Sequence, residues 1–109
     1  MLLKKLMSKI DQLKSLLQAS PNDSFLQHAL ALENIKVGED EEAKKLFETI
    51  LKREPGYVGS YYHLGKLLER NNEMEASIIV YKNGMAQAKA AKDNHSYNEL
   101  QAALEDIED

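Results

Sequence analysis

Chemically similar residues recur along this chain at an interval of 34 positions. The interval separates Pro21 from Pro55, and it separates Gly38 from Asn72, two residues that are typical of turns. It also matches small residues with small ones and bulky residues with bulky ones, in the pairs Ala43 and Ser77, Ala31 and Gly65, Phe47 and Tyr81, Leu51 and Met85, and Leu30 and Leu64. A period of this length indicates repeated supersecondary units that bury their apolar faces by stacking.

Each repeat is predicted to be a pair of helices. In the first repeat Ser24 is the expected N-cap, with Gln27 as its capping-box partner. Gly38 follows the first helix at a position where a positive φ costs little. Pro55 ends the second helix, because the residue before a proline avoids the α region. The predicted helices span residues 24–37, 40–53, 58–70 and 73–91.

Two further helices flank the repeats. An amphipathic helix is expected over residues 2–18, and by register it is the second helix of a unit that lacks its first; its apolar positions are Leu3, Leu6, Ile10, Leu13 and Leu17. After the repeats, Asp93 and Asn94 interrupt the long helix. Ser96 and Glu99 predict a second capping box, and the apolar stripe behind it indicates a terminal capping helix over residues 94–109.

Composition narrows the class of function. The 109 residues fit one domain, and the net charge of −4 argues against nucleic-acid binding, which needs a basic face. The absence of cysteine excludes disulfides and thiolate metal sites. No segment approaches the roughly 20 apolar residues that span a bilayer, and the first residues lack the apolar run of a secretion signal. We therefore expect a cytoplasmic protein that binds neither membrane nor nucleic acid.

The repeat resembles the tetratricopeptide repeat, a helix–turn–helix unit of 34 residues. At motif positions 4, 7, 8, 20, 24 and 27 the second repeat carries Tyr61, Leu64, Gly65, Ser77, Tyr81 and Gly84, and at positions 7, 8, 20, 24 and 32 the first carries Leu30, Ala31, Ala43, Phe47 and Pro55. Gln27, Ile50 and Lys89 depart from the pattern. The resemblance implies an all-α, right-handed solenoid of antiparallel helix pairs, with about six helices.

The expected organisation is a single domain over residues 1–109. It consists of an N-terminal helix (1–20), a first repeat (24–57), a second repeat (58–91) and the capping helix (94–109). Members of the resembled family act mostly as interaction scaffolds that bind a partner protein or peptide on the concave face, which the first helix of each unit lines. The register places these residues on that face: Phe25, His28, Leu32, Tyr62, His63, Lys66 and Arg70.

Other interpretations of these residues remain open. The apolar members of the first repeat could instead pack under the N-terminal helix, since apolar stripes on helices usually belong to the core. The family's chaperone-tail binders carry a clamp of lysine and asparagine residues. In this chain only Lys66 corresponds to a member of that clamp. His28, Asp23 and Ser24 resemble a nucleophile set, but Ser24 is better explained as a cap. We therefore expect no enzyme activity, no metal and no cofactor.

Charge is distributed unevenly along the chain. Residues 1–20 carry four lysines against Asp11, whereas residues 93–109 carry six acidic residues and no Lys or Arg. The N-terminal helix could bind a membrane or a partner, but covering the open edge of the first repeat is the favoured role. The acidic end is interpreted as a solvated tail, and the alternative is head-to-tail contact between two copies. The second functional hypothesis is therefore a self-associating structural subunit, with a homodimer as its simplest form.

Overall fold

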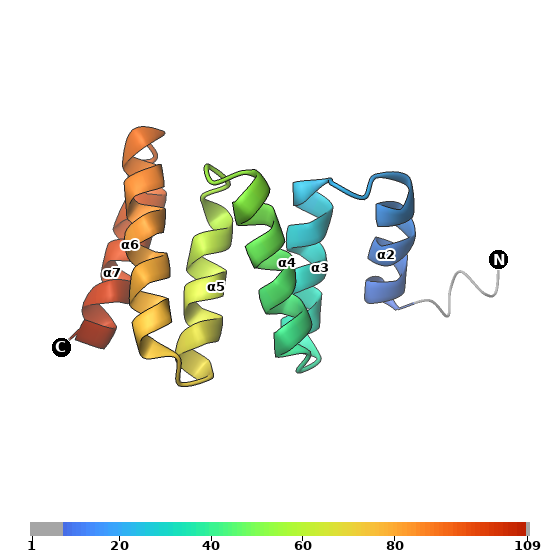
Figure 1. The fold of residues 1–109 in the computed structure, drawn as a ribbon, viewed down its shortest axis with the longest axis horizontal. Coiled ribbons are helices and arrows are strands. Elements are labelled where there is room, and N and C mark those ends of the chain that lie inside the picture. The colour runs from blue at the N-terminus through green and yellow to red at the C-terminus, as the bar shows by residue number, and fades with distance from the viewer. Residues whose placement is uncertain (1–7, 109) are drawn as a thin grey trace. The chain divides into compact units, whose positions relative to one another are not determined.

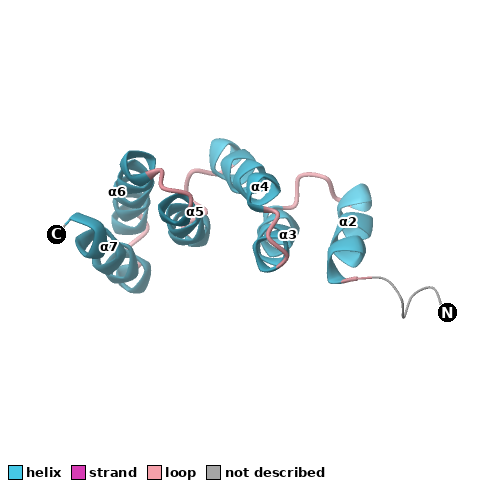
Figure 2. Ribbon diagram, turned by 90° about the horizontal axis from the view of Figure 1, so that it is seen from below, coloured by secondary structure: helices cyan, strands magenta, loops and turns pink. Residues whose placement is uncertain are grey.

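The computed structural model describes residues 8–108, and within that range the chain forms helices and no strands (Figure 1). The helices are α2 (Lys9–Ala19), α3 (Ser24–Lys36), α4 (Asp40–Arg53), α5 (Gly59–Arg70), α6 (Met74–Ala90) and α7 (Asn94–Glu108). Short loops join them (Figure 2). The all-α fold class is confirmed, and the bounds agree with the predicted ones to within one or two residues. The first part of the predicted helix over 2–18, with Leu3 and Leu6, lies outside the described residues.

Three helix ends share one turn geometry. Gly38 after α3, Asn72 after α5 and Lys92 after α6 have φ values of 82°, 63° and 58°. At the first of these turns, the Glu39 N–H donates to the Asn34 carbonyl, five residues back, at 2.8 Å, and the equivalent bond recurs at the other two turns with the same length. This pattern is the Schellman motif, which satisfies the last carbonyls of a helix. The predicted turns at Gly38 and Asn72 are thus confirmed.

The predicted capping boxes are wrong, because an aspartate caps each of these two helices. At α3 the Asp23 carboxylate accepts the Leu26 N–H at 3.0 Å, so Ser24 is the first helical residue. The Gln27 amide points back and donates to the Pro21 carbonyl at 3.0 Å. That bond explains how a glutamine is buried at a position where the second repeat holds a tyrosine.

At α7 the Asp93 carboxylate accepts both the N–H and the hydroxyl of Ser96, at 3.0 and 2.7 Å. Ser96 is therefore a donor to the cap and not the cap that the sequence predicted. These two bonds lower the pKa of the Asp93 carboxyl. A carboxylate at an N-cap also interacts favourably with the positive end of the helix dipole. The aspartate is therefore a better N-cap here than the nearby serine.

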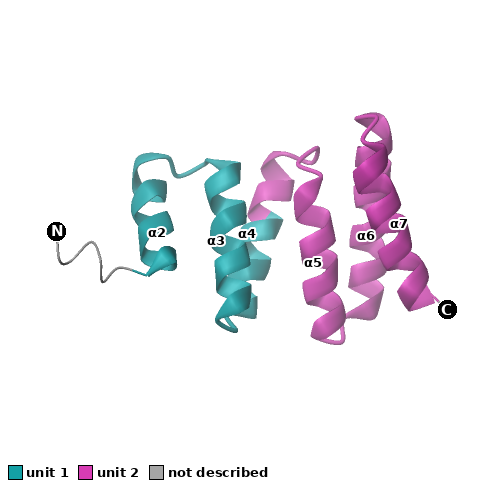
Figure 3. Cartoon of the chain, turned by 180° about the vertical axis from the view of Figure 1, so that it is seen from behind, with its two compact units in different colours: residues 1–48 teal, residues 49–109 magenta. Residues whose placement is uncertain are grey.

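The chain divides into two compact units, residues 1–48 and 49–109 (Figure 3). The boundary lies inside α4, so unit 1 holds α2, α3 and most of α4, and unit 2 holds the end of α4 with α5, α6 and α7. The predicted division into an N-terminal helix, two repeats and a cap stays a prediction. No helix within residues 8–108 is long and apolar enough to cross a membrane.

The core of unit 1 is built from positions that the repeat predicts to be apolar. Its buried members are Leu13, Leu30, Ala31, Ala43 and Phe47. Phe47 is completely buried, and the His28 ring meets it edge-on at a centroid distance of 5.5 Å. α2 and α3 pack against each other, which buries Leu13 of α2. The apolar stripe predicted for the N-terminal helix therefore faces the first repeat, at least over the described turns.

The core of unit 2 forms around two tyrosines on neighbouring helices. Tyr61 and Tyr81 cluster with three buried residues of α7, namely Leu100, Ala103 and Leu104. The Tyr61 hydroxyl donates to the Pro55 carbonyl at 2.6 Å. α7 packs against α6 and, to a smaller extent, α5. The last helix is therefore part of the unit 2 core and not an appendage to it.

Glycine allows α5 and α6 to approach closely. A Cβ added at Gly65 would lie 2.6 Å from Tyr81 Cδ1 and closer still to Cε1. A Cβ at Gly84 would lie 2.6 Å from Tyr61 Cβ. The Ser77 hydroxyl completes the contact by donating to the Gly65 carbonyl at 2.8 Å. Two glycines on opposite helices thus each make room for a tyrosine of the other helix.

Gly65→Ala tests this packing. The added methyl group overlaps the Tyr81 ring, so the ring or the backbone must shift, and we expect a loss of about 1–3 kcal/mol in the free energy of unfolding. Gly56→Ala is the matched control, because a Cβ there meets nothing within 4 Å. Thermal and denaturant unfolding of both variants measure the effect. Equal stability of the two variants would contradict the close approach.

Removal of α7 tests its role in the core. Leu100→Ala leaves a cavity at a side chain that is 1% exposed, and we expect a cost of about 2–5 kcal/mol. Deletion from Asn94 onward exposes the apolar surface around Tyr61 and Tyr81, so the truncated chain should aggregate or lose most of its stability. Unfolding experiments and solution mass report both effects. A truncated chain that remains monomeric and equally stable would show that α7 is dispensable.

Candidate functional site

α5 presents a buried side and an accessible side. Tyr61, Leu64 and Leu68 are buried in unit 2. On the accessible side lie four residues that the sequence placed on the concave face, which we call the α5 face: Tyr62, His63, Lys66 and Arg70. The first three are half-buried, and Arg70 is exposed. Residues three and four apart share one side of a helix, so the spacing of Tyr62, Lys66 and Arg70 forms a continuous strip.

The side chains of the α5 face contact one another. The Lys66 Nζ lies 5.7 Å from the centroid of the Tyr62 ring, within the range of a cation–π interaction. The His63 ring meets the Tyr62 ring edge-on, with centroids 5.5 Å apart and an angle of 85° between the planes. Tyr62 also packs against the unit 2 core cluster. Its ring is therefore held in place before any partner arrives, which lowers the entropy cost of binding.

Glu69 connects the α5 face to the core, and the sequence analysis assigned it no role. Its carboxylate accepts the hydroxyl of Tyr81 and lies 3.7 Å from the Lys66 Nζ. Burial, followed by the hydrogen bond to Glu69, raises the pKa of Tyr81 well above its ordinary value. One signal could have revealed this pair: the first repeat has Ile35 and Phe47 at the same two positions, so a carboxylate and a hydroxyl replace two apolar groups together.

His63 is neutral at neutral pH. Burial lowers the pKa of its imidazole, and the charge of Glu99 on α7 opposes that shift only in part. The α5 face therefore carries two basic side chains, Lys66 and Arg70, and an imidazole that becomes positive in acid. The influence of Glu99 was also missed by the sequence analysis, because it arises from the packing of α7 near α5.

Unit 1 holds the other three predicted site residues. Phe25 is 71% exposed, an unusual exposure for a large apolar ring. His28 and Leu32 are half-buried, and the His28 ring packs on Phe47, so part of its role is structural. A hollow in unit 1 has other lining residues: Ile10, Lys14, Leu30, Asn34, Val37, Glu39, Glu42 and Leu46. The joint use of all seven residues as one site stays a prediction.

The described residues offer no metal site of the usual kind. Between residues 8 and 108 no group of three or more His, Asp or Glu side chains is arranged to hold an ion. Ser24, which the sequence analysis weighed as a nucleophile, is buried at the start of α3. The α5 face brings together an aromatic ring, two basic side chains and an imidazole.

Comparisons with known proteins identify relatives of this chain. No family model matches it. A tetratricopeptide repeat domain protein of Salinibacter ruber is 38% identical, with a TM-score of 0.76, over 79% of this chain and 96% of that one. A structure from Bordetella parapertussis has a TM-score of 0.79 at 20% identity, over 92% of this chain and 87% of that one, and it shows the fold alone.

A curated relative is an enzyme with a similar segment. The human aspartyl/asparaginyl beta-hydroxylase is 29% identical over 82 residues, which are 75% of this chain but 11% of the hydroxylase. The chain therefore spans about a tenth of the length of that relative. The Salinibacter structure, in contrast, is covered almost completely at a higher identity. Together with the 34-residue register and the six helices of residues 8–108, that match shows that the chain belongs to the tetratricopeptide-repeat family.

Proposed function

We propose that this chain is a non-catalytic interaction module that binds an acidic segment of a partner protein on the α5 face of unit 2. Proteins of this fold act in general as protein-interaction repeats. The observation that carries the proposal is the contact cluster of Tyr62, His63 and Lys66, in which a fixed aromatic ring is flanked by cationic or titratable groups. For unit 1, Phe25, His28 and Leu32 stay the proposed binding residues.

Tyr62 is the proposed anchor. Tyrosine combines a large contact area with a polar tip and is enriched among residues that dominate binding energy. The ring is half-buried and already packed on its inner side, so a partner needs to cover only the outer side. Because Tyr62 has few rotatable bonds, little conformational entropy is lost when it is covered.

Lys66 and Arg70 would set the preference for acidic partners. Lys66 already lies near Glu69, but its side chain is 41% exposed, and Glu69 also accepts the Tyr81 hydroxyl. The carboxylate is therefore shared, and Lys66 keeps donors for a partner. Such exposed pairs are screened by salt, so binding should weaken as ionic strength rises.

No activity is carried over from the hydroxylase relative, since the match covers 11% of that enzyme. We therefore assign the chain a binding role without a substrate.

Substitutions on the α5 face test this proposal with arrayed short peptides, acidic, neutral and basic, as probes. The best acidic peptide should lose about 1–3 kcal/mol of binding free energy with Tyr62→Ala, because the anchor is removed. Lys66→Glu should weaken the binding of the same peptide and reduce the salt dependence of its affinity. Lys82→Glu on α6 is the matched control, since that lysine is also exposed and weakly paired with an acid, at 3.9 Å from Glu108.

Unfolding of each variant must accompany these titrations, because Tyr62 also packs against the core. A folded Tyr62→Ala variant with unchanged affinity, together with an unaffected Lys66→Glu, would move the binding site off the α5 face. A preference for basic peptides would contradict the assigned partner chemistry.

The pH dependence of binding tests the part played by His63. Its lowered pKa keeps the imidazole neutral at neutral pH, and the charge appears only as pH falls below the ordinary value of 6.5. An acidic peptide stabilises the charged form, so its affinity should rise as pH is lowered through and below that value. Isothermal titration across this range measures the effect. His63→Gln should flatten the profile, and a slope that survives this substitution would assign the titration to another group.

A further inference from the structure

One apolar side chain of unit 1 is exposed where its repeat equivalents are buried. Leu16, Ile50 and Gly84 follow one another at the 34-residue interval. Ile50 is completely buried, and Gly84 is buried as well, but Leu16 is 55% exposed. The repeat has thus kept a large apolar residue at a position that faces solvent on α2.

The surroundings of Gly84 show what normally covers this position. A Cβ there would touch Tyr61 of α5 on one side and Leu100 of α7 on the other. The position therefore lies between the first helix of its own pair and the first helix of the next pair. α2 has α3 as the following helix, but within residues 8–108 no helix takes the place that α5 has beside α6. Leu16 is exposed, and none of the described helices occupies that place.

α7 has the character of the first helix of a pair, the kind of helix that is not found before α2 within residues 8–108. Its residues Tyr97, Leu100 and Leu104 repeat the spacing of Tyr61, Leu64 and Leu68 with an offset of 36 positions, and both leucines of each set are buried. This offset exceeds the repeat interval by two positions, and α6, with 17 residues, is longer than α4, with 14. α7 therefore has the form of a first helix, packed on α6 and α5.

The second helix of that pair is absent from the described residues, since α7 is the last helix within them. Tyr97, at the place of Tyr61, is half-buried and lines an open hollow with Lys89, Lys92 and Asn94. In α5 the corresponding tyrosine is buried against α6. Within residues 8–108, no first helix precedes α2 and no second helix follows α7.

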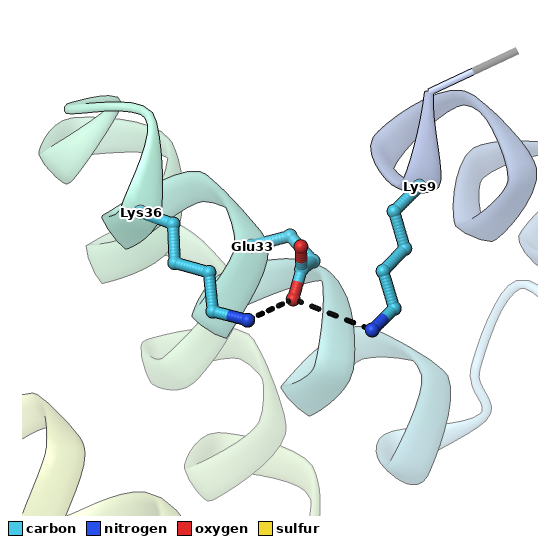
Figure 4. A network of polar contacts seen from close by, with 3 residues as sticks. All are labelled: Lys9, Glu33 and Lys36. Carbon is cyan, nitrogen blue, oxygen red and sulfur yellow. Dashed lines mark hydrogen bonds and ion pairs between the residues drawn. The ribbon is translucent and has the colours of Figure 1, made fainter. Parts of the chain in front are cut away.

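The two helices have opposite charge. α7 carries four acidic residues and no Lys or Arg, whereas α2 carries two lysines and one aspartate. Glu33 of α3 lies 3.9 Å from Lys9 and 2.9 Å from Lys36 (Figure 4). One carboxylate thus serves two lysines, which leaves one positive charge in excess, and the Lys9 side chain is 71% exposed.

We propose that α2 of one copy packs against α7 of a second copy, so that the two helices complete a tetratricopeptide pair. By the repeat register, Leu16 then contacts Tyr97 of the second copy, as Gly84 contacts Tyr61 within unit 2. Lys9 lies at the position of Ser77, which contacts Gly65, so Lys9 faces Gln101, the counterpart of Gly65, one turn from Glu105. The contact joins two different surfaces, so each copy offers one of each and association continues beyond a dimer. It is independent of binding at the α5 face.

Solution mass of the full chain across a wide concentration range tests the proposal first. Mass should rise with concentration and fall with added salt, because opposite charges meet in the contact. Leu16→Glu places an acid against the acidic helix and should raise the dissociation constant by at least about tenfold. Ile79→Glu is the matched control, because Ile79 is 60% exposed on α6 and lies outside the proposed contact.

A mixing experiment distinguishes this contact from a symmetric one. Glu105→Lys places a cation against Lys9 of the neighbour, and Tyr97→Ala removes the apolar contact without a change of charge; each should reduce self-association alone. Leu16→Glu keeps its α7 surface, and Glu105→Lys keeps its α2 surface. An equimolar mixture of these two variants should therefore form a one-to-one dimer and no larger species, with thermal unfolding showing that both remain folded.

Three results would overturn the proposal. The first is a chain that stays monomeric at every concentration. The second is association that survives Leu16→Glu or is equally reduced by Ile79→Glu. The third is loss of association with Leu16→Glu while Glu105→Lys and Tyr97→Ala associate normally and the mixture gives no dimer of the two different variants, which would indicate contact between two α2 helices instead.

Discussion

The close approach of α5 and α6 is the constraint on which unit 2 depends. Gly65 and Gly84 remove the side chains that would separate the helices, and Tyr81 and Tyr61 fill the space on opposite sides. Each tyrosine also directs its hydroxyl to an acceptor at the edge of the core, Glu69 for Tyr81 and the Pro55 carbonyl for Tyr61. The contact therefore fixes both the separation of the helices and the position of their polar ends. In unit 1 the positions of Gly65 and Tyr81 hold Ala31 and Phe47, both completely buried, so a small residue and a ring without a hydroxyl stand there.

The α5 face takes its geometry from that core. Glu69 is held by Tyr81, Lys66 lies near Glu69, and Tyr62 lies below Lys66 in the range of a cation–π interaction. A chain of contacts thus runs from a completely buried ring to an accessible one. The consequence is that stability and binding share residues in this protein. A change deep in the interface between α5 and α6 is expected to move the binding groups as well, because the network transmits displacement through short, directed contacts.

The fold could be predicted from the sequence because its period is strict. A 34-residue register with matched side-chain sizes defines helix pairs, and Gly38 and Asn72 mark their turns correctly. The caps could not be chosen from sequence alone. Asp23 stands directly before Ser24, both are good N-caps, and only the backbone geometry decides between them. The electrostatics of the α5 face could not be predicted from the sequence either. The effect of Glu99 on the pKa of His63 depends on how α7 packs. Local sequence patterns thus predict the helices well, whereas the contacts between helices determine pKa values and hydrogen-bond partners.

The three Schellman turns differ in the steric cost of the residue that adopts a positive φ. Gly38 adopts this conformation without steric cost, and Asn72 tolerates it through its short polar side chain. Lys92 has neither advantage, and a left-handed residue with an ordinary side chain costs roughly 1–2 kcal/mol. Conformational strain is therefore graded along the chain and is greatest at the turn that leads into α7. Local opening begins where the folded state is held least firmly. The hinge at Lys92 makes α7 the helix of unit 2 that is expected to exchange its amide hydrogens soonest.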